Sequence, residues 1–148
     1  MTGSATQRLR FRVRYSETDQ MGVVYHAHVL VWMEVGRTEL LRAIGRPYDG
    51  LEREGVLFPV SEVTCRFTGA ARYGDVVSVV TEIARVRSRD VTFRYRIETE
   101  DGAPVATAEA TVVAVDRDFR PRRIPAEVLS DIRAARGELA AAGEEVLV

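Results

Sequence analysis

Asp19 is the side chain of this sequence that is best placed to do chemistry. It lies in a short polar stretch, residues 16–22, directly before a segment with helical periodicity. The first backbone N–H groups of a helix lack partners within the helix and form the positive end of its dipole. A carboxylate beside them can act as a base or a nucleophile, while the N–H groups hold an oxyanion. These residue types therefore suit attack on a carbonyl group.

The alternative is that Asp19 only caps the helix or satisfies its own loop, as aspartate often does at such places. Two features favour chemistry instead. Gly22, between Asp19 and the helix, lets the loop turn and leaves room for a substrate to approach. The helix is apolar from its first turns, so the carboxylate borders a largely dry space.

The helical segment that follows the loop carries one apolar stripe and runs to a stop at Gly45 and Pro47. The stripe has spacings of three and four residues: Val29, Met33, Gly36, Leu40 and Ile44. Glycine inside a helix costs roughly 1 kcal/mol relative to alanine. We therefore expect another part of the backbone to pass close to Gly36.

The other elements are strands at hairpin spacing, with a short helix near Tyr48–Glu54. Alternation of apolar and polar residues predicts these strands: Leu9–Tyr15, Leu57–Phe67, Asp75–Arg87, Val91–Glu100 and Val105–Val115. Asp101 and Gly102 indicate a tight hairpin turn, and small Ala106, Ala108 and Ala110 leave room for a helix. Short connections favour an antiparallel sheet. The fold class is α+β, with a curved sheet of about five strands around a long central helix.

The 148 residues fit one domain, in which residues 1–7 are expected to be flexible and residues 126–148 to form a helical tail. Hydrophobic residues make up 46% and charged residues 29%, as in soluble globular proteins. The formal net charge of −1 argues against a polyanion binder, and we expect no nucleic-acid partner. No apolar run approaches the roughly 18 residues of a membrane span. A cytoplasmic location is expected.

Metal and cofactor sites have little support in the sequence. Cys65 is the only cysteine, which excludes an intramolecular disulfide and a cysteine-based zinc site. His26 and His28 are the only histidines, and they match no metal-ligand pattern. No phosphate-binding loop, dinucleotide fingerprint or serine-nucleophile elbow is present. We therefore expect a protein that works without metal or cofactor.

One run of residues resembles the signature of a known family. It reads Tyr15-x-x-x-Asp19-x-x-Gly22-Val23-Val24-Tyr25-His26, followed by Glu34-x-x-Arg37-x-Glu39-x-Leu41. This run is similar to that of hotdog-fold acyl-CoA thioesterases of the 4-hydroxybenzoyl-CoA type and their bacterial short-chain relatives. The strand order fits the family to about Pro125. The resemblance implies a hotdog fold and hydrolysis of an acyl-CoA thioester.

The resemblance also implies roles for the residues around the loop. It makes Asp19 the catalytic carboxylate, acting as general base on water or as nucleophile through a mixed anhydride. It makes the backbone N–H of His26 the oxyanion donor, in a loop with Gly22 and Tyr25. The His26 side chain can orient water, hydrogen-bond Asp19 or contact a neighbouring subunit. Tyr15 matches a position whose hydroxyl approaches the site, although it and Tyr25 can equally be core or interface aromatics.

Other carboxylates compete with Asp19. A second branch of hotdog thioesterases uses a glutamate in the middle of the helix, and Glu34 or Glu39 could take that role. Their i, i+3 spacing to Arg37 and Arg42 favours structural ion pairs instead. Hotdog hydratases use an aspartate–histidine pair, but with closer spacing and an Asn-Pro between the two. This chain contains no asparagine.

Coenzyme A carries phosphates, so a local cluster of arginines is expected despite the neutral total charge. The resemblance places the CoA phosphates near the turn that holds Arg87 and Arg89. It also implies that the strand beginning at Pro59, Val60 and Ser61 borders the acyl pocket. A solvated hairpin end is the alternative for these arginines. The cluster Arg120–Arg123 is another candidate for the phosphates.

Together these features predict an acyl-CoA thioesterase that assembles as a homodimer or homotetramer. One sheet around one helix leaves an edge and a face poorly covered, which favours association. Two rival functions stay open: a non-catalytic acyl-CoA-binding or regulatory protein, and an interaction subunit that uses the fold for dimerisation. The sequence does not indicate which acyl chain is bound.

Overall fold

The computed structural model describes residues 6–138 and 146–147. Its strands are β1 (Thr6–Arg12), β2 (Val60–Phe67), β3 (Val76–Val86), β4 (Asp90–Thr99), β5 (Pro104–Val113) and β6 (Val146–Leu147). Its helices are α1 (His26–Ala43), α2 (Tyr48–Arg53) and α3 (Ala126–Glu138), with a 3-10 turn η1 at Tyr15–Glu17. None of the described helices is long and apolar enough to cross a membrane.

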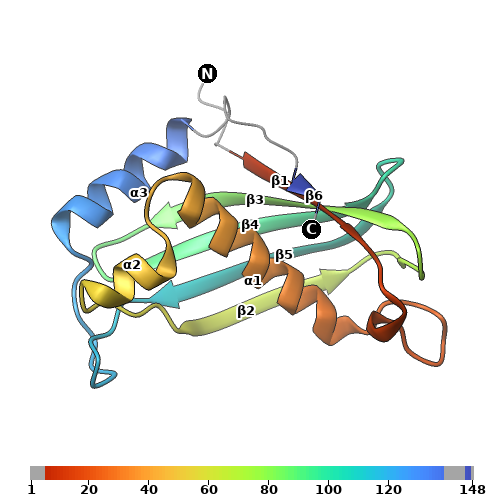
Figure 1. The fold of residues 1–148 in the computed structure, drawn as a ribbon, viewed down its shortest axis with the longest axis horizontal. Helices are drawn as coiled ribbons and strands as arrows, with labels where there is room; N and C mark the ends of the chain where they lie inside the picture. Colours follow the sequence, from red (N-terminus) through yellow and green to blue (C-terminus); the bar gives the residue numbers. More distant parts are fainter. Residues whose placement is uncertain (1–5, 139–145, 148) are drawn as a thin grey trace.

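The strands form one curved sheet in the order β2-β5-β4-β3-β1-β6, and α1 runs along one of its faces (Figure 1). The five main strands pair antiparallel, as short connections predict. The expected α+β architecture is confirmed. At the turn predicted from Asp101 and Gly102, the Thr99 N–H donates to the Ala103 carbonyl at 2.8 Å and Gly102 adopts a φ of +89°.

Both ends of the chain differ from the expectation. Thr6 and Gln7, placed in a flexible segment, begin β1, because the 11-residue strand β3 offers them partners at Glu82 and Thr81. Val146–Leu147, placed in a helical tail, pair in parallel with β1 and so extend the sheet. The predicted helix from residue 126 is found as α3, while residues 139–145 lie outside the described part of the chain.

The strand predicted to reach Tyr15 ends earlier. β1 stops at Arg12, and the chain turns into η1. The turn is held by the Glu17 side chain, which accepts a hydrogen bond from the Arg14 backbone N–H at 2.8 Å. The alternating pattern continues past Arg12 in the sequence, but this hydrogen bond ends the strand.

The core lies between α1 and the inner face of the sheet. The helix turns one stripe inward, and residues three and four apart are buried as the periodicity predicts: Val29, Trp32, Met33, Gly36, Leu40 and Leu41. Opposite them, Phe93, Tyr95 and Ile97 of β4 are almost inaccessible. The predicted alanine row of β5 is also buried under the helix side of the sheet. α3 adds Val128 and Ile132 to the same core.

Gly36 marks the closest approach of α1 to the sheet, although the neighbours are side chains and not backbone. A Cβ atom at this position would lie 2.4 Å from Thr81 Oγ1 and 3.4 Å from Val79 Cγ1, both on β3. The first distance is below any real contact of a Cβ atom. The glycine is therefore required by the helix–sheet packing.

Gly36→Ala is expected to destabilise the protein by on the order of 1–3 kcal/mol, the usual cost of overpacking. Without the contact to the sheet, alanine would stabilise the helix. The sign of the change in the free energy of unfolding therefore shows whether the contact exists. Urea unfolding measures it. Thr81 Oγ1 has no hydrogen-bond partner among the described residues, so Thr81→Ala in the same chain should recover part of the loss. A Gly36→Ala variant as stable as the wild type would contradict this packing.

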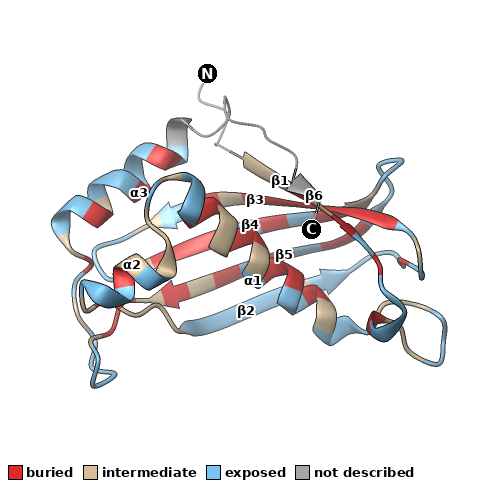
Figure 2. Cartoon of the chain, in the orientation of Figure 1, coloured by how far each residue is buried: buried red, intermediate tan, exposed pale blue. Residues whose placement is uncertain are grey.

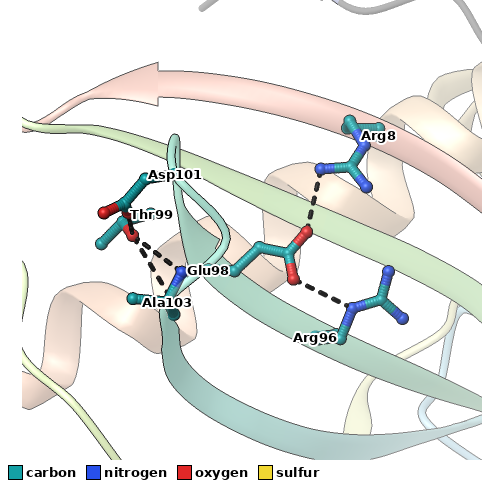
Figure 3. A network of polar contacts seen from close by, with 6 residues as sticks. All are labelled: Arg8, Arg96, Glu98, Thr99, Asp101 and Ala103. Atoms are coloured by element: carbon teal, nitrogen blue, oxygen red, sulfur yellow. Dashed lines mark hydrogen bonds and ion pairs between the residues drawn. The ribbon is translucent and has the colours of Figure 1, made fainter.

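The outer face of the sheet carries arginine and glutamate side chains in cross-strand pairs. Figure 3 shows Glu98 of β4 between Arg8 of β1, at 3.1 Å, and Arg96 of β4, at 3.3 Å. Arg94 likewise reaches Glu82 at 3.0 Å. These residues are partly or largely exposed, where ion pairs contribute roughly 0–1 kcal/mol each. The arginines at the outer face of β1 are thus paired with glutamates, Arg8 with Glu98 and Arg10 with Glu100.

β2 forms the outer edge of the sheet and is the least covered strand. Among the described strands it pairs only with β5, and all its residues are exposed except Cys65, which is half-buried (Figure 2). Val63 and Phe67 share the helix-facing side with Cys65, since their partners are the alanines of β5. Their side chains are still 38% and 47% exposed, which leaves an apolar surface at this edge.

Candidate functional site

The loop that carries Asp19 is a closed turn between η1 and α1. Thr18 and Val24 form an isolated antiparallel bridge, and the Asp19 N–H donates to the Val23 carbonyl at 2.9 Å. The Gly22 N–H donates to the Asp19 carbonyl at 2.9 Å, and Gly22 has a φ of +82°, a conformation that favours glycine. The predicted need for a turning residue at Gly22 is confirmed.

The Asp19 carboxylate is half-buried and accepts one hydrogen bond from its own loop. Its Oδ1 accepts the Met21 backbone N–H at 2.9 Å. No other hydrogen bond from the described residues reaches the carboxylate, so it does not act as a side-chain cap of α1. One carboxylate oxygen is thus left with unused acceptor capacity, which is what a base or nucleophile requires.

α1 begins at His26 with an uncapped N-terminus. The N-cap residue, Tyr25, makes no side-chain hydrogen bond to the helix, and the first turn has no acidic residue. The amides of His26 and Ala27 are therefore donors without an intrahelical partner. This end of a helix carries positive potential and suits a negatively charged oxygen.

Aromatic rings gather around the start of α1. The His26 ring lies 4.4 Å from that of Tyr25 and 6.2 Å from that of Phe67, which comes from the end of β2. Tyr15 meets Tyr73 edge-on at 5.7 Å, and both are largely exposed. His26 is therefore in contact with the sheet edge.

A second loop, residues 68–75, lies against the Asp19 loop. The Val24 N–H donates to the Ala71 carbonyl at 2.8 Å. The Arg72 guanidinium lies close to Gly22, with Nη1 3.7 Å from the position that a Cβ atom would take there. The fold therefore brings Arg72 to the Asp19 end, a contact that spacing in the sequence does not indicate.

Glu17 is a buried carboxylate that sequence reasoning missed. It is 2% exposed and accepts hydrogen bonds from Trp32 Nε1 at 2.9 Å and from the Arg14 side chain at 3.2 Å. Burial alone would raise the pKa of Glu17, but the hydrogen bonds from Arg14 and Trp32 and the charge of Arg14 outweigh it. They lower this pKa, so the side chain is ionised at neutral pH.

The other predicted site residues lie elsewhere in the chain. Pro59, Val60 and Ser61 stand where β2 begins, and Arg87 and Arg89 flank the β3–β4 connection. Both places are at the end of the molecule opposite to the first turn of α1 (Figure 1). A single chain therefore brings Tyr15, Gly22, Tyr25 and His26 to the Asp19 loop, but neither the β2 start nor these two arginines.

Arg87 has a carboxylate partner of its own. It binds Asp90 through two parallel hydrogen bonds, Nε to Oδ1 at 2.8 Å and Nη2 to Oδ2 at 2.7 Å. These hydrogen bonds raise the pKa of Arg87 above its ordinary value. The bidentate contact also closes the turn between β3 and β4. Arg89 is exposed.

The competing carboxylates on α1 have different surroundings. Glu39 and Arg42 form the predicted ion pair at 3.4 Å. The pair predicted between Glu34 and Arg37 is not found among the described residues. Arg37 is buried against the sheet and donates instead to the Tyr95 hydroxyl at 3.4 Å, while Glu34 points to solvent.

In the described part of the chain, no group of three or more histidine, cysteine, aspartate or glutamate side chains could hold a metal ion. A hollow of about 520 Å³ lies on the outer face of the sheet, bordered by Arg66, Arg94, Arg96, Glu82 and Glu109. This hollow is on the opposite side of the sheet from α1 and does not include the Asp19 loop.

Comparison with known proteins identifies the class. A family model described as the thioesterase-like superfamily matches residues 13–132, which span η1, α1, α2, the strands β2 to β5 and the first half of α3, but not β1. The chain therefore belongs to this superfamily. Solved structures of hotdog-fold thioesterases share its fold, so the predicted fold is confirmed. The predicted enzyme class, thioester hydrolase, is confirmed by relatives that are named acyl-CoA thioesterases or thioester hydrolases.

Individual relatives extend over most of the chain. YneP of Bacillus subtilis (strain 168) is 40% identical over 110 residues, covering 74% of this chain and 80% of YneP. The acyl-CoA thioester hydrolase YbgC of Escherichia coli O6:H1 is 34% identical over 123 residues, 82% of this chain and 92% of YbgC. The DHNA-CoA thioesterase of Staphylococcus aureus has a TM-score of 0.82 at 26% identity, covering 97% of this chain and 99% of that one.

Proposed function

We propose that this protein hydrolyses an acyl-CoA thioester to the free acid and CoA. The observation that carries the proposal is the position of Asp19, whose carboxylate has unused acceptor capacity beside the uncapped N-terminus of α1. The similarity to YbgC, a protein named as an acyl-CoA thioester hydrolase, supports CoA as the thiol.

In this mechanism the thioester carbonyl oxygen lies at the start of α1. The backbone N–H of His26 donates to the oxygen as it becomes negative, and the helix dipole adds to this stabilisation. Asp19 either removes a proton from an attacking water or attacks the carbonyl carbon itself to form a mixed anhydride, which water then hydrolyses. CoA leaves as the thiol in both routes.

His26 and Tyr15 are proposed as secondary contributors. His26 is exposed beside the site, and its ring contacts with Tyr25 and Phe67 restrict where it can point. From there its side chain can orient the attacking water. Tyr15 lies at the start of η1 with its ring largely exposed, and its hydroxyl can approach a bound substrate.

We propose that two copies associate through the β2 edge, as a homodimer or within a homotetramer. Support comes from the unpaired side of β2 and from the exposed apolar side chains Val63, Phe67 and Leu30. Because β2 ends beside His26, the second copy would border the site. In an antiparallel pairing of the two β2 strands, the start of one β2 lies beside the end of the other. That arrangement would bring Pro59, Val60 and Ser61 of one copy toward Asp19 of the other.

Arg87 and Arg89 are proposed to bind the CoA phosphates from such a neighbouring copy, through charge-assisted contacts. Replacing both with alanine is expected to raise KM for acyl-CoA more than it lowers kcat. The effect should be much smaller for an acyl-pantetheine, which lacks the nucleotide. Steady-state kinetics with both substrates measures this.

Arg72→Ala is the matched comparison, because Arg72 lies at the Asp19 end of the same chain. If Arg72→Ala raises KM for acyl-CoA and the double variant at Arg87 and Arg89 does not, the phosphate assignment is wrong. Equal damage to both substrates would mean that the Arg87–Asp90 pair only supports the hairpin.

The direct test of the proposed function is a screen of wild-type turnover with a thiol-detecting reagent. Short aliphatic, long aliphatic and aromatic acyl-CoAs are the substrates. Hydrolysis of at least one class is expected, with the preferred class set by how two copies enclose the acyl chain. Tight binding of acyl-CoA without turnover would favour a binding or regulatory protein instead. A cytoplasmic location stays a prediction from the sequence.

A further inference from the structure

Glu17 is a buried charge with an unusual set of partners, two residues before Asp19. Its carboxylate accepts three hydrogen bonds, from Trp32 Nε1 at 2.9 Å, from the Arg14 backbone N–H at 2.8 Å and from the Arg14 guanidinium at 3.2 Å. Burying an unpaired charge is costly. Three donors on one carboxylate offset that cost, and they fix its position closely.

The partners of Glu17 belong to different parts of the fold. Arg14 is local, but Trp32 lies in the second turn of α1 and is itself 2% exposed. The Trp32 ring stacks on Phe11 of β1, with centroids 5.9 Å apart and planes 18° apart. The indole N–H is therefore held by both α1 and β1, and it offers the Glu17 carboxylate an anchor with little freedom.

The backbone of Glu17 ties the loop at its other end. Its carbonyl accepts the N–H of Tyr25, the N-cap residue of α1, at 2.9 Å. One residue thus holds both the beginning of the Asp19 loop and the residue before the oxyanion donors. Thr18, which follows Glu17, pairs with Val24 to close the loop. Asp19 extends from this closed frame.

We infer that Glu17 is a positioning residue for the reaction, which fixes the Asp19 loop against the first turn of α1 through its hydrogen bond to Trp32. The inference rests on the proposed function, in which Asp19 acts on a carbonyl held by the first amides of α1. A local cap would need only the Arg14 amide. The buried bond to Trp32 links the loop to the helix that carries the oxyanion donors, and a misplacement of about 1 Å can cost 10²-fold in rate.

The test uses Glu17→Gln, Trp32→Phe and the variant with both changes. Phenylalanine keeps a ring against Phe11 and removes the N–H donor alone. Each single variant is expected to lower kcat by roughly 10- to 100-fold, with KM changed less than about threefold. Glutamine offers one acceptor oxygen where the Glu17 carboxylate serves three donors, so Glu17→Gln weakens the contact that Trp32→Phe removes. The double variant should therefore lose less kcat than the product of the two single losses. Multiplied effects would show that the two side chains act separately and would overturn the inference.

Val128→Ala is the control for stability. Val128 is buried in α3, away from the loop, and its truncation leaves a cavity. This variant should unfold at lower urea concentration, as the Glu17 and Trp32 variants do, but keep wild-type kcat. If it loses kcat in proportion to its stability, Glu17 acts through stability alone and the positioning role is wrong.

Amide hydrogen exchange by NMR gives a readout that does not depend on activity. The amides of Asp19, Gly22 and Tyr25 are hydrogen-bonded within the loop, and they should exchange faster in Glu17→Gln and Trp32→Phe but not in Val128→Ala. Folded variants with wild-type exchange and wild-type kcat would overturn the inference. A wild-type protein that hydrolyses no acyl-CoA would defeat the proposed function, while the exchange rates still decide whether Glu17 holds the loop.

Discussion

Asp19→Asn is expected to lower kcat by roughly 10²–10⁴-fold while the protein stays folded, and by more if Asp19 is the nucleophile. Asparagine is nearly the same size and can still accept the Met21 N–H that Asp19 Oδ1 accepts at 2.9 Å. The turn that closes the loop uses backbone groups, which the change leaves in place. Asparagine is neither a useful base nor a nucleophile, so the loss falls on the chemical step.

Steady-state hydrolysis with a thiol-detecting reagent measures this loss, and circular dichroism checks that the variant is folded. KM should change little, and binding can tighten as the negative charge is removed. His26→Ala is the matched comparison and should cost less, because the proposed oxyanion donor at this position is a backbone group. If folded Asp19→Asn keeps near wild-type kcat, the mechanism is wrong, and Glu34 or Glu39 becomes the next candidate.

The parts of the fold that the sequence predicted are those in which burial repeats at the period of the backbone. Val29, Met33, Gly36 and Leu40 share one stripe of α1 because a single sheet covers that side. The second half of β4 alternates between buried and exposed residues because only one of its faces meets the helix. In such elements each residue's neighbours follow from its position along the chain.

Predictions failed where a contact between distant residues decided the outcome. The alternation that begins in β1 continues to Tyr15, yet the strand ends at Arg12 because Glu17 turns the chain and is fastened to Trp32, 15 residues away. Spacing predicted a surface pair of Glu34 with Arg37. The guanidinium instead lies on the flank of α1 that meets Tyr95 of β4.

The same distinction between local patterns and contacts of distant residues applies to the candidate site. Asp19, Gly22 and His26 are close in sequence, so the loop and the helix start could be placed together from spacing alone. Arg72 and Phe67 join them only because the 68–75 loop and the end of β2 pack beside α1. The family resemblance predicts that Arg87 binds phosphates. Its bidentate contact with Asp90 depends on the geometry of the hairpin, which the resemblance does not indicate.

Leu30→Arg is expected to prevent association of two copies. Leu30 is 41% exposed on α1. It lies two residues, about 200° round the helix, from Trp32, whose ring stacks on Phe11 of β1, so it is on the flank away from β1. An arginine there stays solvated in a single chain. In a dimer that covers this flank the guanidinium would lie against apolar side chains of the second copy, and burying it costs several kcal/mol. The dissociation constant of the dimer should rise by on the order of 100- to 1,000-fold.

Light scattering after size-exclusion chromatography measures the assembly, and circular dichroism checks the fold. Phe119→Arg is the control, because Phe119 is 66% exposed in the 116–121 turn, outside α1 and β2. The control should keep the mass of the wild type, whereas Leu30→Arg should elute as a monomer. Turnover should fall with the loss of the dimer. Phe67, the last residue of β2, lies beside His26, so a second copy at this edge would enclose the acyl chain. A Leu30→Arg monomer with full activity would show that one chain contains the whole site.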